Sequence, residues 1–247
     1  GSSEIEEALR TVIGSHLSKT DEFPPLIVQK MIEPDVSGTA IKNGDVVIVE
    51  AVKGYGTSLE EGITSPDLYR ISDSIERKIP DRQIESSLNP MTGDIREKET
   101  SRNAPLLKDN QLRQLAEKMT REKYSVKFAY KRGTFYAVDA FESPEVKITA
   151  EMDGIKVSPG EITGQPDKDF VRVSNPKNPE KPMIAEKGGS TSRAAEIARE
   201  KQIPAIFNFT GEYQNGHETE EETNSQGSGN AVTSMTATRV MRADREL

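Results

Sequence analysis

This 247-residue chain contains no cysteine. The absence excludes disulfides, thiolate catalysis and cysteine-ligated zinc, and it fits a reducing compartment. No apolar run approaches the roughly 18 residues that a membrane-spanning helix needs, and no hydrophobic secretory segment stands at the start. We therefore expect a cytoplasmic protein with no membrane partner.

Basic residues are also in deficit, because 33 Lys and Arg stand against 41 Asp and Glu, for a formal net charge of −8. A nucleic-acid partner requires a dense basic face that neutralises phosphates, so none is expected. Histidine is scarce, with His16 and His217 alone. We interpret both as solvated, His16 near the end of a predicted helix and His217 within a polar segment.

The patterns that are present indicate an α+β fold with two domains, since the length suits units of about 100–150 residues each. The first domain, residues 3–145, shows helical periodicity at 3–18 and 107–124. Its other segments predict a mixed, mainly antiparallel sheet, with hairpin turns at Asn43-Gly44 and Arg132-Gly133.

The second domain, residues 146–247, is predicted to be a small β/β/α unit. Its central stretch, "AEKGGSTSRAAEIAREKQIPAIFNFTG", indicates the end of a strand, a glycine turn, a short helix and a second strand. Arg193 stands where the helix begins and is expected to point into the turn, whereas Arg199 is expected to face solvent. Residues 212–230 are acidic and rich in Ser and Gly, which predicts a mobile segment.

Several stretches, in order along the chain, resemble one family. They are "LIVQKMIEPDVSGTA", "VVIVEAVKGYGTSLEEGITSPDLY", "VKFAYKRGTFYAVDAFE" and, in the second domain, "KVSPGEITG" with "GGSTSRAAEIAREKQIPAI". Together they resemble phosphoenolpyruvate synthase and pyruvate phosphate dikinase. The first domain resembles the C-terminal half of that family's ATP-grasp nucleotide-binding domain, and the second resembles its swivelling phosphohistidine domain.

The resemblance implies ATP and Mg²⁺ as ligands. In the family a histidine at the start of the swivelling domain's helix takes a phosphoryl group from ATP, and the domain carries it to a barrel where pyruvate becomes phosphoenolpyruvate. Gln29 and Met31 match positions that line the adenine; alternatively, Met31 is a core residue and Gln29 an ordinary polar strand residue. Asp139 is a candidate nucleotide and metal ligand; alternatively, Asp139 and Glu142 are solvated charges.

The chain departs from the family at the positions that carry chemistry. Arg193 stands at the phosphohistidine position, Lys127 at that of a metal-binding glutamate and Phe141 at that of an arginine. Magnesium prefers hard oxygen ligands, whereas lysine offers only donors and positive charge. The sequence also begins after the first half of the family's ATP-grasp domain and ends before its barrel.

A guanidinium has no available lone pair and cannot act as a reversible phosphoryl carrier, so we expect no catalytic residue at Arg193. A glycine turn that leads into a helix N-terminus can still hold an anion. This predicts a weak phosphate site formed by Gly188, Gly189, Thr191, Ser192 and Arg193. In the alternative interpretation, Arg193 is a surface arginine and the hydroxyls of Ser190, Thr191 and Ser192 cap the helix.

Three functions remain open at this stage. The chain is a non-catalytic or partial relative that binds ATP or another phosphate ligand weakly, or it is a subunit of a split ATP-dependent phosphotransferase. In the second case a partner chain supplies the rest of the nucleotide cleft. The third function is that of an interaction module, in which acidic residues 217–223 recruit a basic partner. A homo-oligomer is compatible with each of them.

Overall fold

The computed structural model describes residues 2–17, 31–119, 124–142, 144, 146–148, 154–157, 171–174 and 176–211. The chain forms two compact units, one of Gly1–Met31 with Thr223–Leu247 and one of Ile32–Glu222. In the first unit, α1 (Ser2–Leu17) confirms the predicted N-terminal helix, and Arg10 pairs with Glu6 one turn away at 2.8 Å. Among the described helices, none combines the length and apolar character that a membrane span requires.

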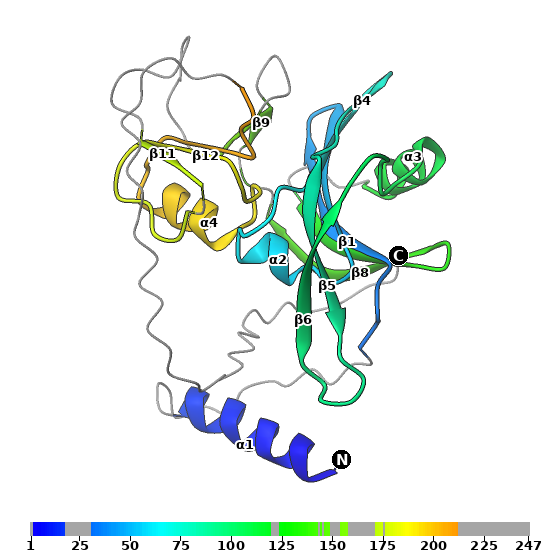
Figure 1. Cartoon of the computed structure of the whole chain (residues 1–247), viewed down its shortest axis with the longest axis vertical. Helices are drawn as coiled ribbons and strands as arrows, with labels where there is room; N and C mark the ends of the chain where they lie inside the picture. The colour runs from blue at the N-terminus through cyan, green and yellow to red at the C-terminus, as the bar shows by residue number, and fades with distance from the viewer. Residues whose placement is uncertain are drawn as a thin grey trace. The chain divides into compact units, whose positions relative to one another are not determined.

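The second unit contains a six-stranded sheet in the order β4-β3-β2-β1-β7-β8, with every neighbouring pair antiparallel (Figure 1). The predicted hairpins are confirmed, with positive φ at Gly44 and at Arg132 and Gly133. The strands are β1 (Val36–Asn43), β2 (Val46–Lys53), β3 (Asp67–Ile71), β4 (Ile75–Lys78), β7 (Tyr124–Lys131) and β8 (Thr134–Glu142).

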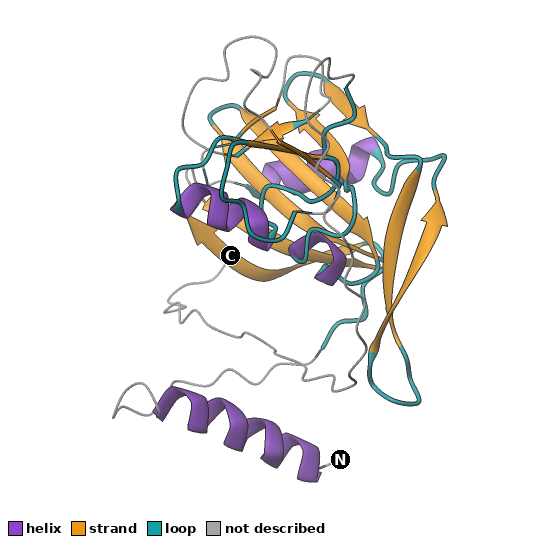
Figure 2. Ribbon diagram, turned by 60° about the vertical axis from the view of Figure 1, so that its left-hand side comes forward, coloured by secondary structure: helices purple, strands orange, loops and turns teal. Residues whose placement is uncertain are grey.

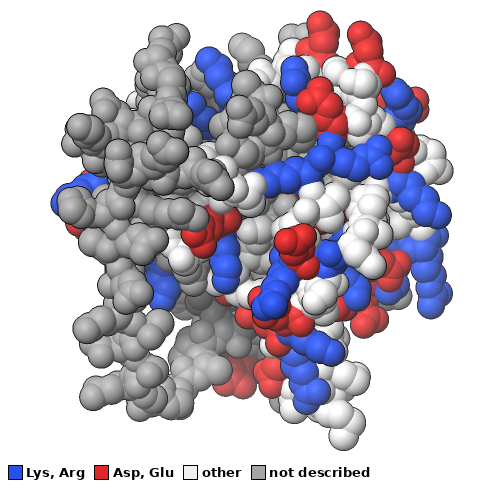
Figure 3. All heavy atoms as spheres, turned by 45° about the horizontal axis from the view of Figure 1, so that its top comes forward, with Lys and Arg blue, Asp and Glu red and all other residues white. Residues whose placement is uncertain are grey.

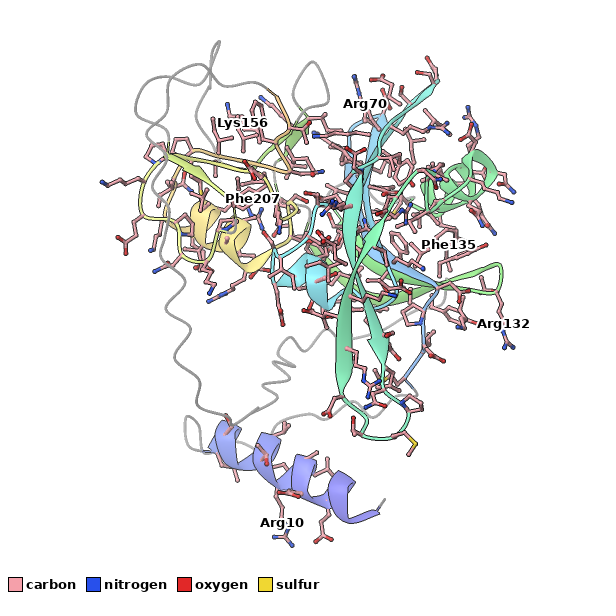
Figure 4. The ribbon with its side chains drawn as sticks, viewed as in Figure 1. Arg10, Arg70, Arg132, Phe135, Lys156 and Phe207 are labelled. Carbon is pink, nitrogen blue, oxygen red and sulfur yellow. The ribbon has the colours of Figure 1, made fainter. Side chains whose placement is uncertain are left out.

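Helix α3 (Asp109–Lys118) covers one face of this sheet. Its buried Leu112 and Leu115 pack in one apolar cluster with Val49 and Phe128 of the strands. Phe135, labelled in Figure 4, joins this cluster and meets Phe128 edge to face, with ring centroids 5.5 Å apart. The helix predicted over 107–124 is present, but it runs only from Asp109 to Lys118.

A five-stranded sheet follows, in the order β11-β12-β13-β10-β9. Strands β11, β12 and β13 are parallel, and α4 (Arg193–Glu200) connects β12 to β13, whereas β10 and β9 are antiparallel additions. The bounds are β9 (Lys147–Ile148), β10 (Ile155–Lys156), β11 (Val171–Val173), β12 (Met183–Ala185) and β13 (Ala205–Phe207).

One apolar core joins the two sheets. Ile41, Ile48 and Leu68 of the six-stranded sheet lie in the same cluster as Ile155 and Phe207 of the five-stranded sheet. Phe207, labelled in Figure 4, shares this cluster with the alanines of α4. The described residues on the two sides of the predicted boundary at 145/146 are thus packed together, and the α+β class with mainly antiparallel sheets is confirmed.

A two-stranded hairpin, β5 (Arg82–Leu88) and β6 (Ile95–Ser101), extends beside the six-stranded sheet (Figure 2). Its base is joined to the end of β2, where Gly54 bridges Ser86 and the Tyr55 N–H donates to the Ser86 carbonyl at 2.9 Å. The short helix α2 (Thr57–Glu60) follows directly and lies beside α4 in both ribbon views (Figures 1 and 2).

Candidate functional site

The glycine turn before α4 rests on a buried carboxylate from β2. Strand alternation places Glu50 on the face opposite that of Val49 and Ala51, and the side chain has no solvent exposure. The Ser190 N–H donates to both carboxylate oxygens, at 2.9 Å to Oε1 and 3.0 Å to Oε2, and the Ser190 hydroxyl also donates to Oε2. The chain's own anion therefore holds the position that we predicted for a phosphate.

Glycine permits this close approach. A Cβ on Gly189 would lie 2.5 Å from Glu50 Oε1 and 2.7 Å from Leu59 Cδ1, too close for any side chain. Gly188 has φ +88°, a backbone conformation that favours glycine, and its N–H donates to the Thr64 carbonyl at 2.8 Å. The two glycines allow the turn to lie directly against the segment that follows β2.

Two further hydroxyl contacts hold the glycine turn in place, one to β1 and one to the N-terminus of α4. The hydroxyls of Thr191 and Thr39 lie 3.1 Å apart, and both side chains are buried. Ser192 is the N-cap of α4, since its Oγ accepts from the Ala195 N–H at 3.4 Å. The structure thus brings Gly188, Gly189, Thr191 and Ser192 together, but as an internal surface covered by β1, β2 and α2.

Arg193 behaves differently from its neighbours in the turn. It is the first residue of α4, and its side chain is 67% exposed. The guanidinium pairs with Glu196 on the next turn of the helix at 3.4 Å. The expectation that Arg193 points into the glycine turn is wrong, because the interior of the turn is filled by Glu50.

Arg199 was expected to face solvent, and that expectation is also wrong. Its side chain is partly buried, and its Nη1 donates to the Ser190 carbonyl at 2.5 Å. Burial lowers the pKa of Arg199, and the carboxylates of Glu196 and Glu50 oppose that shift. Arg199 thus holds the carbonyl of Ser190, while the N–H of the same residue donates to Glu50.

Burial dominates the electrostatics of Glu50. It raises the pKa of this carboxyl, whereas the hydrogen bonds from Ser190 and the charge of Arg199 act in the opposite direction. Desolvation favours the neutral form of a carboxyl, and donors and cations favour the charged form. Burial and the surrounding donors therefore act on the protonation of Glu50 in opposite directions, and burial has the larger effect.

A row of polar residues crosses the sheet from Glu50. Thr39 pairs with Glu50 on one side and with Lys127 on the other, and Lys127 pairs with Asp139 on β8. Directly paired residues share a sheet face, so the row continues outward from beneath the turn. Lys127 Nζ lies 2.7 Å from a carboxylate oxygen of Glu60, and Asp139 is exposed.

This row does not fit Mg²⁺. The residue beside Asp139 is a cation that already holds the Glu60 carboxylate, whereas magnesium requires several hard oxygen ligands. Within the described residues no group of three or more His, Cys, Asp or Glu side chains could hold a metal ion. Figure 3 likewise shows acidic and basic side chains interspersed over the described part of one face.

The remaining predicted positions lie elsewhere. Gln29, His217 and the acidic segment 212–230 are outside the described residues. Met31 belongs to the first compact unit and is 54% exposed.

Sequence reasoning missed Glu50 and the role of Arg199. One signal for Glu50 was present, because a single carboxylate interrupts the apolar strand "VVIVEAVK", a run typical of a strand buried on both faces. A charge in such a run requires an internal partner. The sequence of the strand does not show which residue supplies that partner.

Comparison with known proteins gives limited support for the family resemblance. The chain is similar to the probable phosphoenolpyruvate synthase of Methanocaldococcus jannaschii, with 24% identity over 176 aligned positions. The match covers 56% of this chain but only 14% of the length of that protein. No protein-family profile matches the sequence. The similarity suggests a relationship to that family.

Proposed function

We propose that this chain is a non-catalytic relative of phosphoenolpyruvate synthase, in which the turn that resembles the phosphohistidine turn is held against the sheet by Glu50. The observation that carries the proposal is the Glu50–Ser190 contact, made by three hydrogen bonds to a fully buried carboxylate. Arg193, at the position of the family's histidine, supports it because a guanidinium offers no lone pair for attack on phosphorus.

The contact also argues against capture of phosphate inside the turn. A helix N-terminus binds anions through backbone N–H groups that have no other acceptor. Here the Ser190 N–H is already shared by the two oxygens of Glu50, and a phosphate at the same place would face a buried carboxylate. Any phosphate ligand of the native protein would therefore bind weakly, outside the turn.

The test uses ATP labelled at the γ-phosphate, with magnesium, and the Arg193→His variant as comparison. We expect no acid-labile label on the native chain. Acid-labile label on the native chain that disappears when His16 or His217 is replaced would overturn the proposal. Label on Arg193→His alone would support it, since only the carrier group differs between the two proteins.

A second candidate is a subunit of a split ATP-dependent phosphotransferase completed by a partner chain. One observation favours it: β8 is the outer strand of the six-stranded sheet and exposes Tyr136, Val138 and Asp139. An exposed edge strand with apolar side chains is suited to pairing with another chain. Calorimetric binding of ATP by the mixture of both chains, with none by this chain alone, would favour this candidate over the first.

A further inference from the structure

Residues 62–66, "GITSP", form a connecting segment that is hydrogen-bonded both to the base of the β5–β6 hairpin and to the turn before α4. We propose that this segment couples the two, so that loss of the hairpin's attachment to it loosens the hold of Glu50 on Ser190. The inference concerns the Glu50–Ser190 contact, but it does not depend on a relationship to phosphoenolpyruvate synthase.

Thr64 contacts the hairpin with its side chain and the turn with its backbone. Its Oγ1 accepts from the Ile84 N–H of β5 at 2.8 Å, and its carbonyl accepts from the Gly188 N–H at 2.8 Å. Thr64 is 2% exposed. A buried N–H that loses its acceptor is left unpaired, which is costly, so both contacts are expected to persist together.

Ser65 makes the same two connections in the opposite sense. Its hydroxyl donates to the Glu186 carbonyl, two residues before Gly188, at 3.0 Å. Its carbonyl accepts from the side-chain amide of Gln83 on β5 at 3.2 Å, and Gln83 is 1% exposed. Because each residue holds both neighbours, the connecting segment cannot follow a movement of one without losing a hydrogen bond to the other.

The start of the connecting segment also packs against the turn. Gly62 has φ +73°, and a Cβ there would lie 3.4 Å from Ser192 Cβ. A Cβ on Gly188 would in turn lie 3.5 Å from Gly62 Cα. The two backbones are thus in close contact, so a shift of the segment displaces the turn through packing as well as through hydrogen bonds.

Gln83 holds the strand that carries Glu50 as well. Its side-chain amide donates to the Ala51 carbonyl at 3.2 Å, and its Oε1 accepts from the Lys53 N–H at 3.1 Å. Ala51 follows Glu50 directly on β2. The base of the hairpin is therefore hydrogen-bonded to both sides of the Glu50–Ser190 contact, directly to β2 and through the connecting segment to the turn.

The other end of the hairpin is exposed to solvent. Each of its strands has seven residues, which span roughly 20 Å, and it extends away from the six-stranded sheet (Figure 2). Most of β6 is exposed, and Met91 in the turn of the hairpin is 90% exposed. The coupling therefore connects an exposed element of the fold to a buried contact.

The experiment measures native-state amide exchange of the full chain by NMR at pH 7. Thr64→Val keeps the shape of the side chain but removes the acceptor of the Ile84 N–H. We expect the exchange of Ser190 to become at least tenfold faster. Leu112, whose N–H is bonded within α3, reports global unfolding, and its exchange should change by a smaller factor.

Thr100→Val is the matched control, because its hydroxyl donates within the hairpin at 3.2 Å and does not contact the connecting segment. In this variant Ser190 should exchange at the native rate. Ser65→Ala tests the opposite direction, since it removes the bond to the Glu186 carbonyl on the side of the turn. Coupling is reciprocal, so the exchange of Ile84 on the hairpin should become faster.

Either of two results would overturn the inference. One is exchange of Ser190 at the native rate in Thr64→Val. The other is acceleration of Ser190 and Leu112 by the same factor, which would assign the effect to global unfolding. If Thr64→Val does not fold, Ser65→Ala decides alone, because exchange of Ile84 at the native rate in that variant contradicts the coupling.

Discussion

Glu50 and Ser190 are 140 positions apart in the sequence, yet the Ser190 N–H donates to both oxygens of the Glu50 carboxylate inside the protein. The contact joins the six-stranded sheet to the turn before α4. Removing one partner of such a buried charged hydrogen bond leaves the other unsatisfied, which is costly. The turn is therefore expected to stay where it is as long as the side chain at position 50 can accept from the Ser190 N–H.

Protonation of Glu50 gives a pH dependence of known sign. Burial raises the pKa of this carboxyl in the folded protein above the ordinary value of 4.5, so the folded protein binds its proton more tightly than the unfolded chain does. The contribution of the protonated Glu50 to the free energy of unfolding is fully present below about pH 4.5. It is lost as the pH rises through the folded-state pKa of this carboxyl. Glu50→Gln should flatten this loss and be more stable than the native chain at pH 8.

The measurement is the free energy of unfolding in urea between pH 4 and pH 8. Asp67 is buried and its pKa is raised as well, so part of the slope will remain in Glu50→Gln. Glu99→Gln is the control, since Glu99 belongs to an exposed pair with Arg82. An identical slope in the native chain and in Glu50→Gln would show that Glu50 does not titrate in this range.

Gly189→Ala tests the close approach of the turn. The added methyl group would lie 2.5 Å from Glu50 Oε1 and 2.7 Å from Leu59 Cδ1, so the turn must move. We expect a loss of about 1–3 kcal/mol in the free energy of unfolding, typical of overpacking. Gly56→Ala is the matched control, because its methyl group would meet Ser37 Cβ at an ordinary 3.6 Å. Equal stability of the two variants would contradict the described packing.

The two arginines of α4 should differ in their effect on stability. Arg199→Ala removes the 2.5 Å hydrogen bond to the Ser190 carbonyl and some packing, for an expected loss of about 1–3 kcal/mol. Arg193→Ala removes only an exposed pair with Glu196, which is worth less than about 1 kcal/mol. Chemical denaturation of both variants measures the difference, and a larger loss in Arg193→Ala would reverse the assignment.

The hairpin turns could be predicted from the sequence, whereas the contacts of the candidate site could not. Asn43-Gly44 and Arg132-Gly133 marked both hairpins correctly, because turns of this kind require positive φ and their sequence signals are local. A bulge shifts the partner of Lys127 from Val138 to Asp139, but the pairs nearer the turn, from Phe128–Ala137 to Lys131–Thr134, follow from the position of the second hairpin. These features depend only on residues close together in the chain.

The contact of Glu50 with Ser190 could not be predicted in this way. Helical spacing in α4 does not distinguish Arg199, which lies under the turn, from Arg193, which lies in solvent. That difference is set by the packing of β2 against the turn, a tertiary contact between distant segments. The polar residues of "GGSTS" indicated an anion site, but their sequence does not reveal that the anion belongs to the chain.

Amide hydrogen exchange of Ser190, followed by NMR at pH 7, tests the attachment of the turn most directly. If the N–H is held by Glu50, its exchange should be slowed at least about 100-fold relative to an unstructured peptide, and Glu50→Ala should remove most of this protection. Exchange of Ser190 in the native chain at the rate of an unstructured peptide would contradict an internally held turn.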